Sequence, residues 1–407
     1  MPRVIVIGAG AAGSMAAISA ASAGADTLLL ERTTDGGRKI LISGGGRCNI
    51  LPARLEESRF VTDSSSHTVR KILRSWPLAD QIGFFEREAG IPLVEEPATA
   101  KLFPVSQSAR DVRDRLLALT RSRGVTIRMN TLVAGIVPVN GGWSVACEEG
   151  APLTADAVVV ATGGLSVPKT GSDGTGLRVA GQLGHVIHPT YAALTPLIAA
   201  PAPFAHLAGV SLPVTITARS AERRASATGG FLFTHRGYSG PAVLDVSHVA
   251  VRATSGGTPA TLVVRWSTLG DAEWNEALRP RGTRTVLTSL STALPDRLAA
   301  ALLGQARVDP DQTLATLRRE DRRRLINVLV RGELPWTSDE GYAKAEVTGG
   351  GVALSEIDPG TMESRRHPRL FLCGEMLDAF GPIGGYNFFW AWATGRAAGF
   401  GAAGRLG

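Results

Sequence analysis

The sequence contains few cysteines. It has three, Cys48, Cys147 and Cys373, which are odd in number and widely separated along the chain. A disulfide framework requires paired cysteines and a structural zinc site requires clustered ones, so this pattern argues against both and favours a reducing compartment. We therefore expect no metal site.

Long apolar runs are missing as well. No segment reaches the roughly 18 uninterrupted apolar residues that mark a membrane-spanning helix. The first apolar run, Val4 to Ile7, opens a folded strand and is followed by a glycine turn, so it does not have the pattern of a secretory signal. We expect a cytoplasmic protein without membrane contact.

The chain also lacks an uninterrupted basic cluster. The formal net charge of +7, from 43 Lys and Arg against 36 Asp and Glu, indicates either anionic ligands or only a solvated basic surface. The longest basic cluster, Arg318 to Arg324, is interrupted by Glu320 and Asp321, and no nucleic-acid-binding motif surrounds it. We expect a small-molecule substrate and no nucleic-acid partner, and the oligomeric state stays open.

With 407 residues, the chain is longer than one hydrophobic core usually supports, which indicates two or three domains. Residues 1–190 and 340–407 alternate short strands, glycine turns and helical segments. Between them, residues 191–267 contain short β-branched runs separated by turns, and residues 268–325 carry leucine and alanine at helical spacing. We expect a discontinuous α/β domain, an inserted antiparallel β domain joined by residues 326–339, and a helical lid or cap.

The stretch from Val4 to Asn49 is the most informative part of the chain. Its first strand runs directly into the turn Gly8-Ala9-Gly10-Ala11-Ala12-Gly13 and an alanine-rich helix, and its second strand ends at Glu31. In such a motif the first glycine permits a tight turn, the second lets the backbone approach a pyrophosphate, and the third lets helix and strand pack closely. The acid then accepts hydrogen bonds from a ribose, so the spacing predicts dinucleotide binding.

A second glycine-rich stretch follows at residues 36–49, which read GGRKILISGGGRCN. A flexible linker is one interpretation, but linkers seldom hold a Leu-Ile pair between charged and glycine-rich segments. We favour a loop that wraps a phosphate or flavin, with Arg38, Lys39 and Arg47 near negative charge. Cys48 then lies near the redox centre, or it is only a small buried hydrophobe.

Two further strands end in small-residue turns. The apolar strand at residues 157–160 runs into Ala161-Thr162-Gly163, and the strand at residues 370–373 runs into Gly374-Glu375. The second acid can accept from ribityl hydroxyls, and the glycine turn at residues 381–387 opens a helix whose N-terminus stabilises negative charge on a reduced flavin. The opening motif alone allows NAD or FAD, and these distant elements favour FAD. Residues 170–176 either cap a helix or form a second phosphate or substrate loop.

These stretches together resemble the FAD-dependent flavoprotein family that includes aminoacetone oxidase and a bile-acid steroid-ring reductase. The matching segments are GAGAAG at 8–13, GRKILISGGGRCNI at 37–50, ATGGLSVPKTGSDGTG at 161–176, FLFTHRGYSGPAVLDVS at 231–247, VTGGGVALSEIDPGTMES at 347–364 and LFLCGEMLDAFGPIGGYNF at 370–388. The resemblance implies a Rossmann-like FAD-binding domain, discontinuous in sequence, with inserted β-barrel-like and helical domains. Phe380 and Phe389 stand where smaller or polar residues are expected, which puts the substrate in doubt and not the cofactor.

The cofactor site follows from the motifs and from the resemblance. A strand near Val133 is expected to reach the adenine through its backbone, and the histidines show no attachment motif, so we expect FAD to be held non-covalently. The expected cofactor-binding residues are Gly8, Gly10, Ala11, Ala12, Gly13, Glu31, Arg32, Arg38, Lys39, Ser43, Gly44, Gly45, Gly46, Arg47, Cys48, Asn49, Val133, Ala161, Thr162, Gly163, Gly374, Glu375, Gly384, Gly385, Tyr386 and Asn387.

A second dinucleotide motif is absent, because residues 171–176 space their glycines as GxxGxG. NAD(P)H is therefore expected to dock transiently as a donor, or the substrate itself reduces the flavin. The candidate catalytic acids and bases are Tyr386, Cys48 and His235, with His188 as a further candidate. His235 follows a strand of the inserted domain and either faces the flavin or is an ordinary surface histidine.

The function expected from the sequence is that of an FAD-dependent oxidoreductase. It would transfer a hydride between FAD N5 and a small or medium organic substrate, in amine oxidation or in C=C reduction. A non-catalytic flavin-binding sensor is the second hypothesis. An RNA-modifying flavoprotein, suggested by the basic charge balance, is the third.

Overall fold

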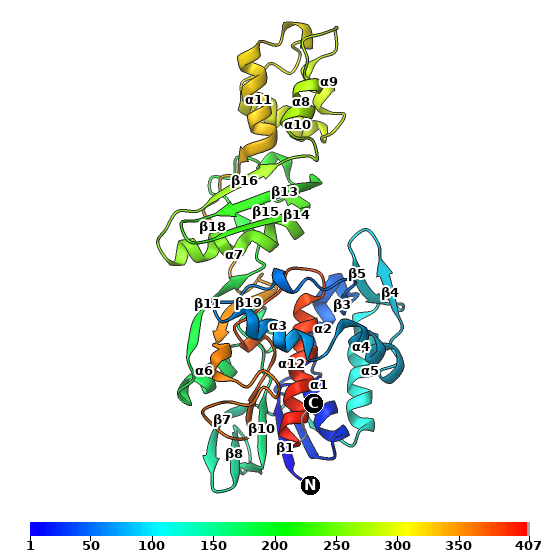
Figure 1. Cartoon of the computed structure of the whole chain (residues 1–407), viewed down its shortest axis with the longest axis vertical. Coiled ribbons are helices and arrows are strands. Elements are labelled where there is room, and N and C mark those ends of the chain that lie inside the picture. The colour runs from blue at the N-terminus through cyan, green and yellow to red at the C-terminus, as the bar shows by residue number, and fades with distance from the viewer. Residues whose placement is uncertain (405–407) are drawn as a thin grey trace. The chain divides into compact units, whose positions relative to one another are not determined.

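The structure is a computed structural model, and it describes residues 1–404. The chain divides into two compact units. The first unit contains residues 1–191 and the chain from residue 347 onward, and the inserted unit contains residues 192–346. In Figure 1 the blue N-terminal and red C-terminal segments meet in the first unit, so the two ends of the chain build one body.

The first unit is built on a parallel β-sheet with the strand order β20-β10-β1-β2-β6. All four neighbouring pairs run parallel. Apart from β6 and the first residues of β1 and β2, the strand residues are buried, as expected of short apolar runs in a parallel sheet. The strands are β1 (Arg3–Ile7), β2 (Asp26–Leu30), β6 (Thr126–Arg128), β10 (Ala157–Val160) and β20 (Leu370–Leu372).

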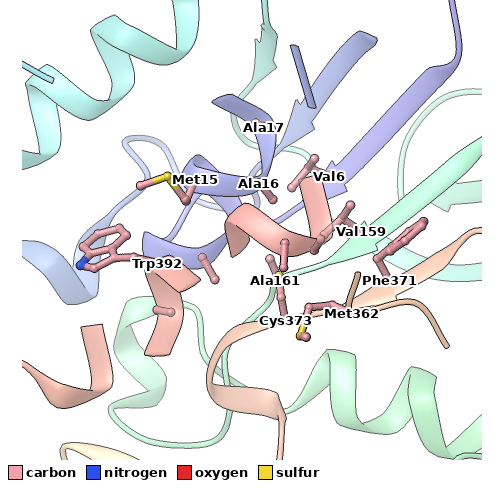
Figure 2. Close-up of a cluster of buried hydrophobic side chains, with 14 of the residues drawn as sticks. Val6, Met15, Ala16, Ala17, Val159, Ala161, Met362, Phe371, Cys373 and Trp392 are labelled. Atoms are coloured by element: carbon pink, nitrogen blue, oxygen red, sulfur yellow. The ribbon is translucent and has the colours of Figure 1, made fainter. Parts of the chain in front are cut away.

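Helices α1 (Ala11–Ser22) and α12 (Tyr386–Ala402) come from opposite ends of the chain and pack against each other. Small residues permit the close contact, because a Cβ atom on Gly395 would lie 2.3 Å from the carbonyl oxygen of Ala12. Figure 2 shows the buried cluster at this contact, with Met15, Ala16 and Trp392 beside residues of the sheet. The N-terminal and C-terminal cofactor segments are therefore fixed in one rigid core.

The remaining elements of the first unit surround this core. The GGRKILI stretch, expected as a loop, forms a short helix, because Arg, Lys, Leu and Ile follow Gly37 without a further breaker. Two antiparallel pairs, β4 with β5 and β7 with β8, form hairpins. These elements are α2 (Arg38–Ile42), β3 (Leu51–Pro52), α3 (Ser66–Arg74), α4 (Leu78–Gly83), β4 (Leu93–Glu96), β5 (Lys101–Pro104), α5 (Ala109–Ser122), β7 (Val133–Val139), β8 (Gly142–Cys147), β9 (Leu153–Ala155), α6 (Thr175–Gln182), β11 (Ile187–Ala193) and β19 (Val347–Val352).

The inserted unit contains a seven-stranded sheet with the order β17-β16-β13-β14-β15-β12-β18. Helix α7 (Pro241–Ser255) packs on β13 and β14, although residues 191–267 were expected to be a β domain. Val243, Val246 and Val249 recur at helical spacing behind a proline that starts the helix. The strands are β12 (Leu197–Ile198), β13 (Ser211–Arg219), β14 (Arg224–Phe233), β15 (Gly237–Ser239), β16 (Thr261–Arg265), β17 (Gly332–Glu333) and β18 (Ser338–Asp339).

A helical part completes the inserted unit. Its last helix continues to Arg331, beyond the expected end at residue 325, and β17 and β18 then rejoin the sheet by pairing with β16 and β12. Trp266 of the sheet region and Trp274 and Leu298 of the helices belong to one buried cluster. The helices are α8 (Asp271–Ala277), α9 (Val286–Leu290), α10 (Asp296–Ala306) and α11 (Arg319–Arg331).

Within residues 1–404, no helix combines the length and apolar character needed to cross a lipid bilayer. The same residues contain no cluster of three or more His, Cys, Asp or Glu side chains arranged to hold a metal ion.

Candidate functional site

Four of the expected cofactor segments lie at one edge of the parallel sheet. Strands β1, β2, β10 and β20 run in the same direction, so their carboxyl ends meet at that edge. The segments that follow these ends are residues 8–13, Glu31, residues 161–163 and residues 374–375. In open α/β sheets this edge is where ligands bind. The fold thus assembles the segments from both ends of the chain.

The glycine turn after β1 leaves no room for side chains on its inner side. A Cβ atom at Gly13 would lie 1.7 Å from the carbonyl oxygen of Gly8, and one at Gly8 would lie 2.7 Å from that of Ala161. At Gly10, by contrast, a Cβ atom would meet nothing within 4 Å. Helix α1 begins there without a side-chain cap or an acidic first turn, so its free N–H groups suit a pyrophosphate.

Glu31 lies buried at the end of β2. Its carboxylate accepts hydrogen bonds from the backbone nitrogens of Ala9 (2.7 Å) and Thr33 (2.8 Å) and from the Thr33 hydroxyl (2.7 Å). A carboxylate has about four acceptor positions, so one is left for a ribose hydroxyl. Arg32 forms an ion pair with Asp173 and thereby ties this strand end to residues 170–176.

Three other expected residues, Val133, Thr162 and Gly163, lie close to these strand ends. The backbone around Val133 is held beside the acid, because Thr131 N donates to the Glu31 carbonyl oxygen at 2.8 Å. After β10, Thr162 Oγ1 accepts a hydrogen bond from Gly176 N at 3.1 Å at the start of α6. Gly163 has a φ of +76° and a Ser172 hydroxyl close above its α-carbon. Residues 170–176 therefore pack against the turn after β10.

The second glycine stretch continues from the first turn. Gly37 N donates to the carbonyl oxygen of Ala9 at 2.9 Å, which joins the start of α2 to the turn after β1. After α2, Gly44, Gly45 and Gly46 have φ values of +55°, +67° and +86°, a left-handed conformation that other residues rarely adopt. Since a Cβ atom at Gly45 or Gly46 would meet nothing within 4 Å, this backbone is open to a ligand.

The three cations of this stretch have different partners. Arg38 donates to Asp35 at 2.7 Å and Arg47 to Glu96 at 3.0 Å, so both guanidinium groups are paired with acids of this chain. Lys39 alone reaches the acid that follows β20, Glu375. Of the three, Lys39 is therefore the one that the fold connects to a second predicted cofactor segment.

Glu375 is the centre of a half-buried polar network. Its carboxylate accepts from the Lys39 ammonium group, the Ser166 hydroxyl, and the backbone nitrogen (3.0 Å) and hydroxyl (2.9 Å) of Thr348. Lys39 Nζ also donates to Ser166 Oγ at 2.7 Å. Four segments of the first unit meet at this carboxylate. Ser166 and Thr348 were not expected among the cofactor-binding residues.

The C-terminal glycine turn is linked to the second glycine stretch. With its amide oriented to satisfy both neighbours, Asn49 accepts from Gly385 N at 2.9 Å and donates to the carbonyl oxygen of Leu51 at 3.0 Å. Asn387 closes the turn through hydrogen bonds of 2.9 Å to the nitrogen and oxygen of Gly381. Helix α12 thus begins beside the end of the second glycine stretch.

Tyr386 and Cys48 are held in ways that limit their acid–base roles. The Tyr386 hydroxyl donates to the carbonyl oxygen of Arg54 at 3.2 Å and accepts from Glu56 N at 3.4 Å, with its ring buried. Burial raises the pKa of the Cys48 thiol to about 12, and a contact with Ser43 lowers it only in part. Cys48 is therefore neutral near pH 7.

The two histidine candidates lie in different parts of the chain. His235 is exposed in the loop between β14 and β15 of the inserted unit. His188 lies on β11 in the first unit, and its Nε2 atom is 3.7 Å from the Asp378 carboxylate. Burial raises the pKa of Asp378, and hydrogen bonds from Ser64 and Thr62 together with the nearby His188 oppose that rise.

Asp378 was not recognised from the sequence. Its carboxylate accepts from the hydroxyl (2.8 Å) and backbone nitrogen (2.7 Å) of Ser64, from the hydroxyl of Thr62 (3.0 Å) and from Asp63 N (3.0 Å). The sequence offers one indication of its role: Asp378 lies in the segment Leu377–Phe380, between Glu375 and the C-terminal glycine turn. Its partners come from a distant segment that only the fold brings near.

A parallel Rossmann-like sheet, a glycine turn opening a buried helix, a buried acid at the end of the second strand and a C-terminal glycine turn are typical of flavin-dependent oxidoreductases. A model of the family described as "HI0933-like protein Rossmann domain" matches residues 2–401, and the chain belongs to this family. It is an FAD-dependent oxidoreductase, and the segments at the sheet edge fit that cofactor.

The relatives span the whole chain. A ribosomal RNA dihydrouridine synthase of Escherichia coli (strain K12) is 35% identical, over 97% of this chain and 96% of the relative. A protein with the same name from Haemophilus influenzae (strain ATCC 51907 / DSM 11121 / KW20 / Rd) is 32% identical, over 97% and 96%. A 3-dehydro-bile acid delta(4,6)-reductase of Clostridium scindens (strain ATCC 35704 / DSM 5676 / VPI 13733 / 19) is 31% identical over 100% of both chains.

A solved structure shares the fold. The 3-ketosteroid delta1-dehydrogenase from Sterolibacterium denitrificans superposes with a TM-score of 0.55 and 14% identity, covering 99% of each chain. This likeness concerns the fold alone.

Proposed function

We propose that this enzyme reduces a carbon–carbon double bond conjugated to a carbonyl group, and that its substrate is uridine within RNA. The observation that carries the proposal is the full-length similarity to relatives named for such reductions. Dihydrouridine is uridine with its C5–C6 bond, which is conjugated to the C4 carbonyl, reduced. The delta(4,6) bonds of a 3-dehydro bile acid are conjugated to a ketone in the same way.

Two observations favour RNA over a steroid. Two of the three relatives are named for ribosomal RNA, and one of them has the higher identity, 35% against 31%. The net charge of +7 also suits a polyanionic substrate. From the sequence alone, RNA modification is only the third hypothesis and no nucleic-acid partner is expected. The names of the relatives reverse that ranking in our proposal.

Such a reduction adds a hydride to the carbon β to the carbonyl and a proton to the α-carbon, and FAD supplies the hydride when it is bound. Among the candidates for the proton, the contacts in the first unit favour His188. The Tyr386 hydroxyl is already bonded to backbone, and the Cys48 thiol, with a pKa of about 12, is a weak acid. Asp378 is 3.7 Å from His188 Nε2 and is placed to orient the imidazole.

Electrons must also reach the enzyme from a donor. Within the described residues, the first unit has one G-x-G-x-x-G turn that leads from a strand into a helix, at residues 8–13, and the same spacing at residues 399–404 lies at the end of α12. We therefore keep NAD(P)H as a donor that docks transiently and leaves before the RNA substrate reacts.

Nucleoside analysis tests the proposal. The purified holoenzyme is reduced with NADPH without oxygen, incubated with ribosomal RNA that lacks dihydrouridine, and the RNA is digested for mass spectrometry. We expect dihydrouridine, heavier than uridine by two hydrogen atoms, and none with enzyme whose flavin has been removed. Absence of dihydrouridine with a fully reduced flavin would contradict the proposal.

The second candidate is reduction of a steroid enone. It is favoured by the bile-acid reductase, which is similar over 100% of both chains. A parallel incubation with a 3-oxo-Δ4 steroid separates the two candidates. Reduction of the steroid with no change in the RNA would select it.

A further inference from the structure

Helix α3 presents a basic face to the solvent. Val69, Ile72 and Leu73 are buried on one side of the helix, and the exposed side carries His67, Arg70, Lys71 and Arg74. These four positions follow the spacing i, i+3, i+4 and i+7, so they form one stripe along the helix. A solvated helix face would account for such a stripe on flat surface, but this stripe lines a groove.

The groove, named here the α3 groove, consists of two adjoining hollows that share Arg70 and Arg74. One hollow has a volume of about 590 Å³ and is lined on its other side by residues 55–62. The other has a volume of about 420 Å³ and reaches Lys71 and Gly360. The groove is open to solvent along the helix, which suits an extended chain better than an enclosed small molecule.

The charge of the α3 groove is positive. Arg74 donates to both carboxylate oxygens of Glu57, at 2.8 and 2.9 Å, and is therefore neutralised. Arg70 bonds only to Ser66 of its own helix, and no acidic side chain within residues 1–404 pairs with Arg70 or Lys71. Two cations are thus left for an anionic ligand.

The α3 groove adjoins the candidate site. Phe60, in its wall, has its ring centroid 5.8 Å from that of Tyr386, the first residue of α12. Thr62, also in the wall, donates to the carboxylate of Asp378. A chain that lies in the groove therefore passes the segments that carry the His188–Asp378 pair and the C-terminal glycine turn.

We propose that the α3 groove binds the phosphodiester backbone of the RNA beside the reacting uridine, an inference that rests on the proposed function. A helix of nine residues is roughly 13.5 Å long, which is enough to face more than one phosphate of a single strand. Lys and Arg contacts of this kind position a nucleic acid without reading its sequence. Arg70 and Lys71 are the two phosphate ligands.

Binding of a fluorescent single-stranded RNA to the holoenzyme at several salt concentrations tests the groove. In R70E/K71E we expect at least tenfold weaker binding near physiological salt. The slope of log Kd against log salt should fall by about 1.4, at ~0.7 for each lost contact with a single strand. R70Q/K71Q should show the same change in slope with less risk to folding. The matched control is R110E/R121E on α5, whose two arginines are exposed in the same unit.

Three readouts separate the outcomes. Flavin content and flavin reduction by NADPH should match the wild type in every variant, which shows that the site is intact. If the wild type forms dihydrouridine and R70E/K71E keeps its affinity within twofold and its salt slope unchanged, the groove assignment is overturned alone. If the wild type neither binds RNA nor forms dihydrouridine, the proposed function and the groove assignment both fail.

Discussion

Two helical glycines, one in each unit of the chain, differ in what surrounds them. In the first unit, a Cβ atom at Gly13 in helix α1 would lie 1.7 Å from a carbonyl oxygen, whereas at Gly304 in helix α10 of the inserted unit it would meet nothing within 4 Å. Glycine at the first position lets helix and strand touch beneath a cofactor. Glycine at the second position makes no such contact, so of these two helical glycines only Gly13 is required by packing.

The largest effect is expected for a substitution at Gly13, with Gly304 as the comparison. Gly13→Ala inserts an atom where backbone already stands, so we expect purified protein with less than a tenth of the wild-type FAD and a loss of unfolding free energy of about 3 kcal/mol. Gly304→Ala should retain FAD and gain about 0.5–1 kcal/mol, because alanine is the better helix former. Flavin absorbance and thermal unfolding measure both. Normal FAD content in Gly13→Ala would remove the close-contact argument.

The second effect concerns the two histidines, one in each unit. His188→Gln should lower single-turnover reduction of the substrate about 100-fold, as expected when a positioned acid is removed, with FAD content unchanged. His235→Gln, at an exposed loop, should stay within twofold of the wild type. Equal rates for His188→Gln and the wild type would exclude His188 as the proton donor, and a large loss in His235→Gln would move that role to the inserted unit.

The third effect compares a half-buried network with a surface ion pair. Glu375→Ala leaves the Lys39 ammonium group without its acid, which should cost about 2 kcal/mol and weaken FAD binding about 30-fold. Asp271→Ala breaks the pair with Arg331, where both side chains are half exposed, and should change stability by at most about 1 kcal/mol. Titration of apoprotein with FAD measures the first change, and denaturant unfolding the second. Unaltered FAD affinity in Glu375→Ala would show that the network is not part of the cofactor site.

The smallest effect concerns Cys48. All three cysteines lie in the first unit, and the inserted unit contains none. Its folded pKa, about 12, lies above its unfolded value, so its contribution to stability is complete below the unfolded pKa and is lost as the pH rises toward 12. Between pH 8 and ~10, the free energy of unfolding should therefore fall by about 1 kcal/mol less in Cys48→Ser than in the wild type. At pH 8 a thiol reagent should reach Cys147 before the buried Cys48 and Cys373. Rapid labelling of Cys48 in the native protein would contradict its burial.

Local spacing made the sheet edge predictable from the sequence. The segments at Gly8, Glu31, Gly163 and Glu375 each follow an apolar strand, and parallel strands must bring such ends together. The same reasoning fails where partners are distant in the chain. Nothing in the sequence near Asp378 indicates that residues 62–64 and His188 surround it.

The inserted unit was harder to predict for a different reason. Helix α7 is rich in β-branched valines, whose local preference is for strand, and packing against β13 and β14 overrides it. The helical part shares one buried cluster with the sheet. Composition alone does not show whether the two form one domain or two. The spacing of a motif indicates where the backbone must approach a ligand. The inserted unit has few such motifs, so its structure was harder to predict.

Stoichiometry is the most direct test of the central claim, that the flavin site in the first unit reduces uridine in RNA. A reduced, oxygen-free holoenzyme is mixed with RNA, flavin oxidation is followed by its visible absorbance, and the dihydrouridine formed is counted in the same sample. The account predicts one dihydrouridine for each flavin oxidised, and no oxidation with RNA whose uridines are already reduced. Flavin that stays reduced in the presence of RNA, or that is oxidised without forming dihydrouridine, would contradict it.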